Sequence, residues 1–334
     1  MLPTKEFMSL PKVLMTRKVP EQAMAYLQNQ CELIVWDADR PVPRSWMLAQ
    51  VSDAEGLYCL LTDSIDTEIL KKASRLKVIS TMAVGFDNIE IGECTRRGIP
   101  VGNTPGVLTE TTADFTFALM MAAARRIVEG AEYVQNGQWD TWSPTLLLGQ
   151  DLHGATLGII GFGRIGQAVA RRAKGFDMKV LVSGSPRTEP SQTRDASPVD
   201  HVDLHSLLVQ SDFVTLHVPL TKKTKHLIGA QEFHLMKKTA VLVNTSRGPV
   251  VNSKALYQAL LGGEIGYAAL DVTDPEPIRH DDPLLTLSNC LIVPHIASAS
   301  VATRNKMAMM AVENLLAGLK GRPLPQCVNP EVYT

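Results

Sequence analysis

Three residues whose side chains suit carbonyl reduction occur in the C-terminal half of the chain. Arg247, Glu276 and His295 each lie in a turn that follows an apolar, strand-like run. Histidine is a common proton donor, a carboxylate bonded to it stabilises the imidazolium, and arginine binds carboxylates and polarises carbonyls. Taken singly, each is more often a surface charge, a solvated carboxylate or a structural histidine. All three at expected strand ends, where ligands bind in open parallel sheets, favour a catalytic role.

A glycine motif earlier in the chain predicts a dinucleotide site. Gly161, Gly163 and Gly166 form Gly-x-Gly-x-x-Gly directly after an apolar run and directly before a helical pattern. The first glycine would permit a tight turn, the second a close approach to a pyrophosphate, and the third close packing of helix on strand. We therefore expect this turn, including Arg164 and Ile165, to bind the cofactor at a helix N-terminus. A glycine-rich turn without a ligand is the alternative.

The type of dinucleotide is predicted from the end of the next expected strand, 178–182. NAD sites usually carry an Asp or Glu there for the ribose 2′-hydroxyl, but this chain continues with Ser183, a glycine, Ser185 and, after a proline, Arg187. Hydroxyls and a guanidinium can bind a 2′-phosphate that a carboxylate would repel. The sequence therefore favours NADP(H), with NAD(H) possible if Arg187 is only a solvated loop residue.

Composition excludes several other classes of protein. The chain has 334 residues and a net charge of −1, which gives no electrostatic reason to expect nucleic acid or an anionic membrane as a partner. The length suggests about two domains. Neither a signal peptide nor a membrane-spanning run is apparent. Five scattered cysteines without a C-x-x-C motif and eight histidines without metal-ligand spacing predict a cytoplasmic protein with no metal.

Strand-like and helical patterns alternate along most of the chain, which predicts parallel sheets covered by helices. Expected strands are 12–16, 32–36, 56–61, 76–80, 99–101, the run before Gly161, 178–182, 213–218, 240–244, 267–271 and 290–293; expected helices are 21–29, 44–51, 67–73, 109–130, 167–175, 205–210, 231–237, 253–262 and 301–318. The helix at 301–318 has no strand after it, so we expect it to return to the first domain.

Residues 136–149 form an irregular segment that contains Trp139, Trp142 and three consecutive leucines. Such side chains are unfavourable in water, so we expect an arm that packs on a second copy in a homodimer together with the helix from Thr109. A loop buried within the chain is the alternative.

Five stretches together give the chain a specific resemblance to a known family. Over nearly its whole length it is similar to the D-2-hydroxyacid dehydrogenases, particularly the glyoxylate/hydroxypyruvate reductase branch. The matching stretches are Met-Ala-Val-Gly-Phe-Asp-Asn (82–88), Gly-Phe-Gly-Arg-Ile-Gly-Gln (161–167), Asn-Thr-Ser-Arg-Gly (244–248), Leu-Asp-Val-Thr-Asp-Pro-Glu-Pro (270–277) and Pro-His-Ile-Ala-Ser (294–298).

The resemblance implies an α/β fold of two doubly wound parallel-sheet domains with the active site between them. A flavodoxin-like substrate domain would comprise 1–105 and 299–334, and a Rossmann dinucleotide-binding domain 106–298. Arg247, Glu276 and His295 would be the family's catalytic residues. The substrate-binding residues would be Val84, Gly85, Arg247 and His295, and further cofactor contacts would come from Thr109, Pro219, Asn244 and Asp271. His217 and His153 are expected to be structural.

The implied activity is NADPH-dependent reduction of a small 2-oxo acid, glyoxylate first and hydroxypyruvate next, with His295 as proton donor. A phosphite dehydrogenase is an alternative within the family, but its lysine before the glycine is replaced here by Val84, which cannot grip a dianion. Phosphoglycerate dehydrogenase is disfavoured because no regulatory domain follows. A dinucleotide-sensing corepressor is an alternative of another class, disfavoured because the Arg, Glu and His are all present.

Overall fold

The structure is a computed structural model that describes residues 10–184 and 199–334. Ser185 and Arg187, which the sequence assigns to the cofactor, lie outside the described residues. Within the described chain, 10–108 together with 300–334 form one compact unit, and the residues of 109–299 form the other.

Unit 1 (10–108 and 300–334) is built on a five-stranded parallel sheet in the order β2-β1-β3-β4-β5. This is the flavodoxin-like order of a doubly wound sheet. Its elements are β1 (Lys12–Met15), α1 (Glu21–Gln28), β2 (Glu32–Val35), α2 (Arg44–Gln50), β3 (Gly56–Cys59), α3 (Thr67–Lys72), β4 (Val78–Thr81), α4 (Ile91–Arg96), β5 (Val101–Gly102), α11 (Val301–Leu319) and a 3-10 helix, η4 (Pro330–Tyr333).

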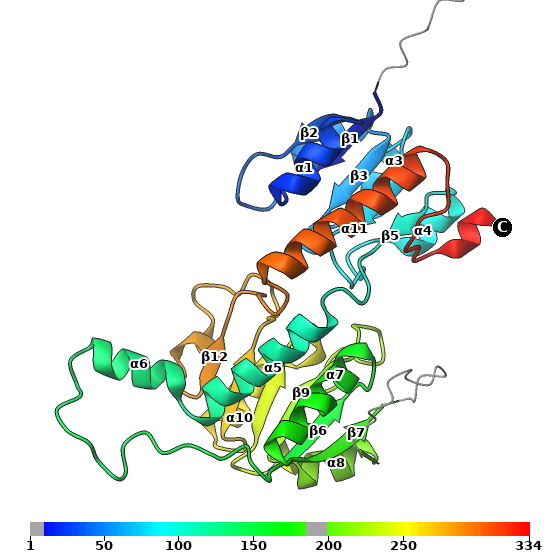
Figure 1. Cartoon of the computed structure of the whole chain (residues 1–334). Helices are drawn as coiled ribbons and strands as arrows, with labels where there is room; N and C mark the ends of the chain where they lie inside the picture. Colours follow the sequence, from blue (N-terminus) through cyan, green and yellow to red (C-terminus); the bar gives the residue numbers. More distant parts are fainter. Residues whose placement is uncertain (1–9, 185–198) are drawn as a thin grey trace, which may run out of the picture. The chain divides into compact units, whose positions relative to one another are not determined.

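The two faces of this sheet carry separate apolar cores, one under α2 and α3 and one under α1 and α11. The Ser80 hydroxyl of β4 donates to the Ala311 carbonyl over 2.8 Å, and a Cβ on Gly318 would lie 2.5 Å from Val78. Glycine therefore permits close contact between α11 and β4. Figure 1 shows α11 running along the sheet of this unit.

Unit 2 (109–299) carries a seven-stranded parallel sheet in the order β12-β11-β10-β9-β6-β7-β8. Counted from β6, this is the Rossmann order with one further strand. Its elements are α5 (Thr109–Ala124), α6 (Ile127–Gln135), β6 (Thr156–Ile160), α7 (Arg164–Ala173), η1 (Lys174–Phe176), β7 (Lys179–Ser183), β8 (Asp200–His201), α8 (Leu204–Gln210), β9 (Phe213–Leu216), α9 (Ala230–Leu235), β10 (Val241–Asn244), η2 (Gly248–Val250), α10 (Ser253–Leu261), β11 (Tyr267–Leu270), η3 (Pro283–Thr286) and β12 (Cys290–Ile292).

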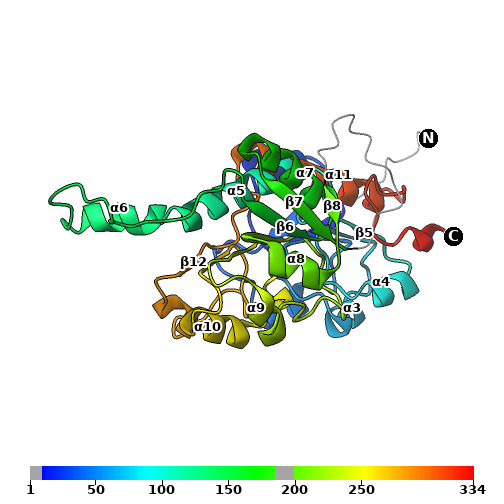
Figure 2. The same cartoon turned by 90° about the horizontal axis from the view of Figure 1, so that it is seen from below.

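Helices cover both faces of the second sheet. One core joins the sheet to α5 and α7, and the other joins it to α8, α9 and α10. Figure 2 shows α8, α9 and α10 together on one side of the strands. The predicted fold class, two doubly wound parallel-sheet α/β domains, is confirmed.

The single helix expected at 109–130 is wrong. The chain instead forms α5 and α6, because Arg126 between them takes a left-handed conformation with φ 52°. None of α6 is buried, and Trp139 and Trp142 after it are 60% and 77% exposed. The alternative of a loop buried within the chain is therefore also wrong. Figures 1 and 2 both show α6 and the segment after it projecting from unit 2 as an arm, residues 126–149.

Both ends of the arm meet at the end of α5. The Gln150 N–H donates to the Ala124 carbonyl over 2.8 Å, and a Cβ on Gly149 would lie 2.2 Å from the same oxygen. Glycine is therefore required where the returning chain crosses α5.

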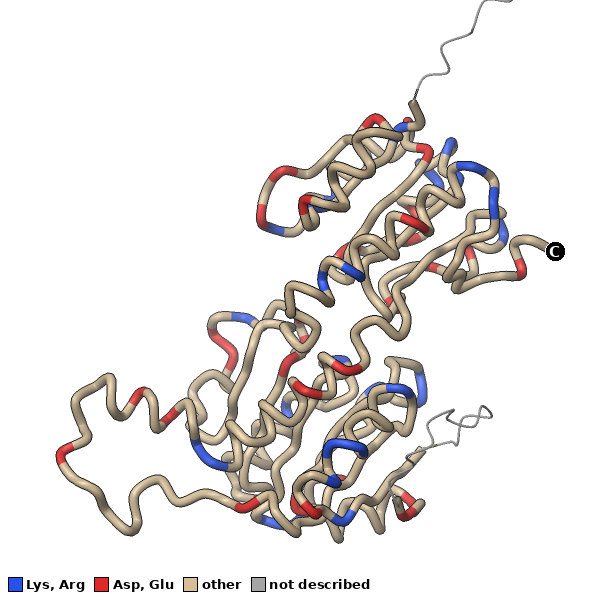
Figure 3. The backbone as a smooth tube through the Cα atoms, in the orientation of Figure 1, with Lys and Arg blue, Asp and Glu red and all other residues tan. Residues whose placement is uncertain are grey.

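Charges of both signs are interspersed in each unit, as Figure 3 shows. Within the ranges described, none of the helices combines the length and apolarity needed to cross a membrane.

Candidate active site

The loop after β10 presents Arg247. The buried Asn244 side chain accepts from the Ser246 N–H at 3.0 Å and from its hydroxyl at 2.8 Å, and donates to the Arg247 carbonyl at 3.0 Å. These three bonds hold the backbone on both sides of the arginine. Arg247 itself is partly exposed and donates from Nη1 to the Ser246 carbonyl at 2.8 Å. Asn244 is therefore a positioning residue for Arg247.

The loop after β11 is in close contact with the loop after β10. A Cβ on Gly248 would lie 1.8 Å from the Thr273 carbonyl oxygen, so only glycine can occupy that position without moving the backbone. Thr273 in turn donates its hydroxyl to the Pro275 carbonyl at 2.8 Å. This close contact sets Glu276 beside the loop that carries Arg247.

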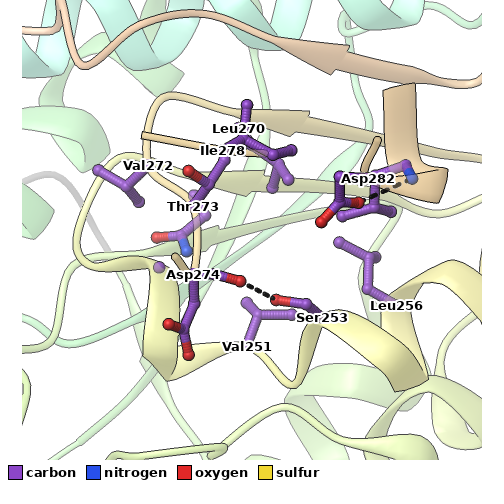
Figure 4. A pocket seen from close by; sticks show the side chains of 12 residues that line it. Val251, Ser253, Leu256, Leu270, Val272, Thr273, Asp274, Ile278 and Asp282 are labelled. Atoms are coloured by element: carbon purple, nitrogen blue, oxygen red, sulfur yellow. Dashed lines mark hydrogen bonds between the residues drawn. The ribbon is translucent and has the colours of Figure 1, made fainter. Parts of the chain in front are cut away.

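Figure 4 shows a hollow behind this loop, between β11 and the residues that begin α10. Ser253 donates to the Asp274 carbonyl across it at 3.4 Å. The hollow holds only about 10 Å³, about the space of one water molecule. This space between the Glu276 loop and α10 is too small for a substrate.

Glu276 and His295 form a direct pair. His295 Nδ1 lies 2.5 Å from Glu276 Oε1. The His295 side chain is 23% exposed and the Glu276 side chain is 27% exposed. This proximity agrees with the expectation that a carboxylate is bonded to the histidine. Because Nδ1 faces the carboxylate, a proton donated by His295 would leave from Nε2. His295 has φ 53°, a left-handed conformation that non-glycine residues adopt uncommonly and that histidine adopts more often than most.

Asp271 at the end of β11 holds the histidine loop. It is 1% exposed, and its carboxylate accepts from the Ile296 N–H at 2.6 Å and from the Ala297 N–H at 2.9 Å. The Asp271 carbonyl also accepts from the His295 N–H at 2.9 Å. Burial raises the pKa of Asp271, while the two N–H donors oppose this rise. The carboxylate thus fixes the backbone on the C-terminal side of His295.

The glycine turn after β6 has the expected geometry. Gly161 has φ 98°, and a Cβ on Gly166 would lie 2.2 Å from the Gly161 carbonyl, so α7 packs tightly on the turn. No described atom lies within 4 Å of a Cβ built on Gly163, the N-cap of α7, and no side chain caps the helix. An open position above uncapped N–H groups fits a pyrophosphate. Arg164 and Ile165 form the first turn of α7.

Three further residues of unit 2 that the sequence assigns to the cofactor are Ser183, Pro219 and Thr109. Ser183 ends β7, and its carbonyl accepts from the Gly161 N–H at 2.9 Å; Pro219 is exposed in the loop after β9; Thr109 begins α5 and is partly buried. Ser183 thus lies beside the glycine turn.

The expected substrate residues Val84 and Gly85 lie in the loop after β4 of unit 1. The Val84 carbonyl accepts from the Asn103 amide at 2.8 Å. Within the described part of the chain, the N–H groups of Val84 and Gly85 have no hydrogen-bond acceptor. Gly85 is partly exposed and lies next to the exposed end of this loop, so these two donors fit a carboxylate.

In unit 2 the candidate residues follow the strand order along one sheet edge. Because all the strands are parallel, the loops after β12, β11, β10, β9, β6 and β7 open at the same carboxyl edge. They carry His295, Glu276, Arg247, Pro219, the glycine turn and Ser183 in that order. A histidine–carboxylate pair and an arginine on the same sheet edge as a glycine turn of the dinucleotide-binding type are the groups that a nicotinamide-dependent dehydrogenase needs.

Comparison with known proteins agrees with this class. The sequence profile of the family described as "D-isomer specific 2-hydroxyacid dehydrogenase, NAD binding domain" matches residues 117–297. The chain is 51% identical to the glyoxylate reductase of Korarchaeum cryptofilum (strain OPF8), over 96% of this chain and 97% of that one. It is 46% identical to the glyoxylate reductase of Thermococcus litoralis, over 97% and 98%.

Solved structures also superpose on the chain over nearly its whole length. The TT0316 protein from Thermus thermophilus has a TM-score of 0.88 at 45% identity, covering 95% of this chain and 99% of that one. An NADPH-dependent glyoxylate/hydroxypyruvate reductase from Sinorhizobium meliloti, solved with NADP and malonate, has a TM-score of 0.84 at 28% identity, covering 97% and 98%. The chain belongs to the D-isomer specific 2-hydroxyacid dehydrogenases, in the branch of these glyoxylate reductases, and is an NAD(P)-dependent dehydrogenase.

Proposed function

We propose that this enzyme reduces glyoxylate, and less preferentially hydroxypyruvate, to the corresponding 2-hydroxy acid with NADPH. The observation that carries the proposal is the partly exposed His295–Glu276 pair on the same sheet edge as Arg247 and the glycine turn. The names of the relatives at 44–51% identity, all glyoxylate reductases, support the choice of substrate.

The residues divide the reaction between them. When bound, the reduced nicotinamide supplies a hydride to the carbonyl carbon. His295 transfers the proton on Nε2 to the carbonyl oxygen and keeps the Nδ1 proton directed at Glu276, which stabilises the imidazolium before transfer. Arg247 binds the substrate carboxylate and polarises the carbonyl. The backbone amides of Val84 and Gly85 donate to the substrate carboxylate. Neither residue carries a positive charge that could bind a second anionic group, which favours a monocarboxylate.

The preference for NADPH rests on the sequence after β7. Ser183, Ser185 and Arg187 replace the carboxylate expected of an NAD site, and an Arg can pair with a 2′-phosphate. In the same proposal the glycine turn with Arg164 and Ile165 holds the pyrophosphate. Thr109, Pro219 and Asn244 line the cofactor site, and Asp271 accepts from the carboxamide with the lone pairs that Ile296 and Ala297 leave available.

We also propose that the arm makes the enzyme a homodimer. Exposed apolar side chains concentrate on it, namely Ile127, Val128, Val134, Trp139, Trp142 and Leu148. A large apolar surface on a projecting segment is typical of an interface between copies. Trp139→Ala combined with Trp142→Ala should shift the protein toward monomer in sedimentation at micromolar concentration. A wild-type protein that is already monomeric under these conditions would contradict the proposal.

Steady-state kinetics test the assignment of substrate and cofactor. We expect kcat/KM to be highest for glyoxylate with NADPH, followed by hydroxypyruvate, with pyruvate and phosphite lower. Arg187→Ala should lower kcat/KM for NADPH and leave that for NADH nearly unchanged, because only NADPH carries the 2′-phosphate. A preference for NADH, or phosphite as the best substrate, would contradict the assignment.

A further inference from the structure

His217 is a partly exposed residue whose two ring nitrogens are buried and have no partner among the described residues. It follows β9, and its N–H donates to the Ile160 carbonyl at 2.8 Å, so it continues the strand pairing beside β6. Both ring nitrogens are buried, and neither has a hydrogen-bond partner among the described residues. Burial lowers the pKa of His217 to about 3, so the ring is neutral, with one donor and one acceptor.

Leaving these groups unpaired is unfavourable, because a buried donor or acceptor without a partner loses its bonds to water. Native proteins contain few such groups, and a bound molecule is one explanation of them. A histidine kept only for packing would be better replaced by an apolar side chain. The expectation that His217 is structural therefore does not explain the residue.

The backbone of His217 forms part of the glycine turn. A Cβ on Gly161 would lie 2.7 Å from the His217 carbonyl carbon and 2.8 Å from its oxygen. The strand order reverses between β9 and β6, and ligands of open sheets bind at this switch point. His217 is thus next to the place where a dinucleotide crosses the sheet edge, on the side of β10 to β12 and the catalytic residues.

We propose that His217 is a cofactor-binding residue whose neutral ring hydrogen-bonds the dinucleotide at the pyrophosphate and the adjoining ribose on the nicotinamide side. The inference rests on the proposed cofactor site. It assigns the adenosine end to the β7 side, where Ser183 lies, and the reacting end to the side of His295. The ring's donor and acceptor suit a ribose hydroxyl, and its donor suits a phosphate oxygen.

Thr215 provides a matched control on the same strand. It lies two residues before His217, so both side chains point to the same face, and its hydroxyl is also buried without a partner in the described chain. Thr215 is fully buried and paired in register with Ile159 and Val243 inside the sheet. It is therefore too deep to reach a ligand at the edge.

Titration of the apo protein with NADPH, followed by calorimetry, tests the proposal. We expect His217→Leu to raise the Kd about tenfold without lowering the thermal unfolding temperature of the apo protein. Thr215→Val should change the Kd less than about twofold, and His217→Gln, which keeps a donor and an acceptor, should restore part of the affinity. Equal affinity of wild type and His217→Leu would overturn the proposal. Failure of the wild type to bind either NADPH or NADH would instead contradict the proposed function.

Fragments and NMR locate the contact. His217→Leu should weaken ADP-ribose as much as NADPH and leave 2′-phospho-AMP nearly unchanged, since the latter lacks the second phosphate and the outer ribose. An equal loss for 2′-phospho-AMP would overturn the assigned position. If His217→Leu does not fold, the ring ¹⁵N shifts of His217 in the wild type, assigned against His217→Gln, should move on saturation with NADPH. Unchanged shifts would overturn the contact.

Discussion

In the loops after β10 and β11, the buried polar side chains Asn244 and Asp271 are bonded to backbone beside Arg247 and His295, whereas His217 after β9 has no described partner. Both regions lie on one sheet edge, in adjacent strands. The first uses its hydrogen bonds to fix the backbone beside Arg247 and His295 in the absence of a substrate, which is the preorganisation that their proposed catalytic roles require. In the second, the ring of His217 would form its hydrogen bonds with the dinucleotide, as proposed above.

The difference gives a rule for distinguishing the roles of polar residues at a site. A satisfied buried group such as Asp271 acts through the backbone it holds, and its removal should affect stability and catalysis together. An unsatisfied group such as His217 should affect binding while stability is unchanged or improved. Substitutions in the two regions should therefore differ in which property they change.

The largest effect is expected in the loops after β10, β11 and β12, which we call the preorganised region. His295→Asn removes the proton donor, so kcat for glyoxylate should fall by about 10²–10⁴-fold. Because His295 is assigned to chemistry and not to cofactor affinity, the Kd for NADPH should remain within about twofold of wild type. Rapid-mixing kinetics and NADPH titration measure the two quantities. Turnover close to wild type would remove His295 from its proposed role.

Asp271→Asn tests whether removing the hydrogen bonds of a fully bonded buried group lowers both the free energy of unfolding and kcat. An amide can accept only through one oxygen, so one of the Ile296 and Ala297 N–H groups loses its partner and faces an NH₂ group instead. We expect the free energy of unfolding to fall by about 3 kcal/mol and kcat to fall with it. Urea unfolding and steady-state assays provide the measurements. A fall in kcat at unchanged stability would show that Asp271 acts only through its contact with the cofactor and not through the loop.

The contrast between these regions also explains what the sequence could predict. The strand and helix types follow from apolar periodicity, and the positions of Arg247, Glu276 and His295 after parallel strands imply a shared edge. The pairing of His295 with Glu276 agrees with the roles that the resemblance to the family implies. Three features of the fold were not predicted: α4 and β8 were missed, and the helix from Thr109 does not continue beyond Ala124.

These failures have physical causes outside local sequence. The left-handed Arg126 separates α5 from α6 at the place where Gly149 and Gln150 return to pack on Ala124. Gly149 and Ala124 are 25 positions apart in the sequence, so no local pattern indicates this contact. The bonds of Asp271 to Ile296 and Ala297 likewise depend on β11 and β12 being neighbours. The unpaired state of His217 can be seen only once its surroundings are assembled.

The stability of the apo protein in acid should depend on His217. With a pKa of about 3 when folded and about 6.5 when unfolded, the ring gains a proton on unfolding at pH values between the two. Its contribution to stability is therefore complete above about pH 6.5 and is lost as the pH falls toward 3. From pH 8 to pH 5, the wild type should lose roughly 1–2 kcal/mol more than His217→Leu. Parallel loss in both proteins would show that the ring is not buried and neutral.

The smallest effect is expected for Ser253→Ala, at the hollow behind the Glu276 loop. The Ser253 hydroxyl reaches the carbonyl of the exposed residue Asp274 only over 3.4 Å, so water can replace it. The loop is held mainly by the contact of Gly248 with Thr273, which the substitution does not alter. We expect the free energy of unfolding and kcat for glyoxylate to remain within about 0.5 kcal/mol and twofold of wild type. A larger loss of kcat at unchanged stability would mean that α10 helps to set the position of Glu276, and the preorganised region would then extend beyond the loops of the sheet edge.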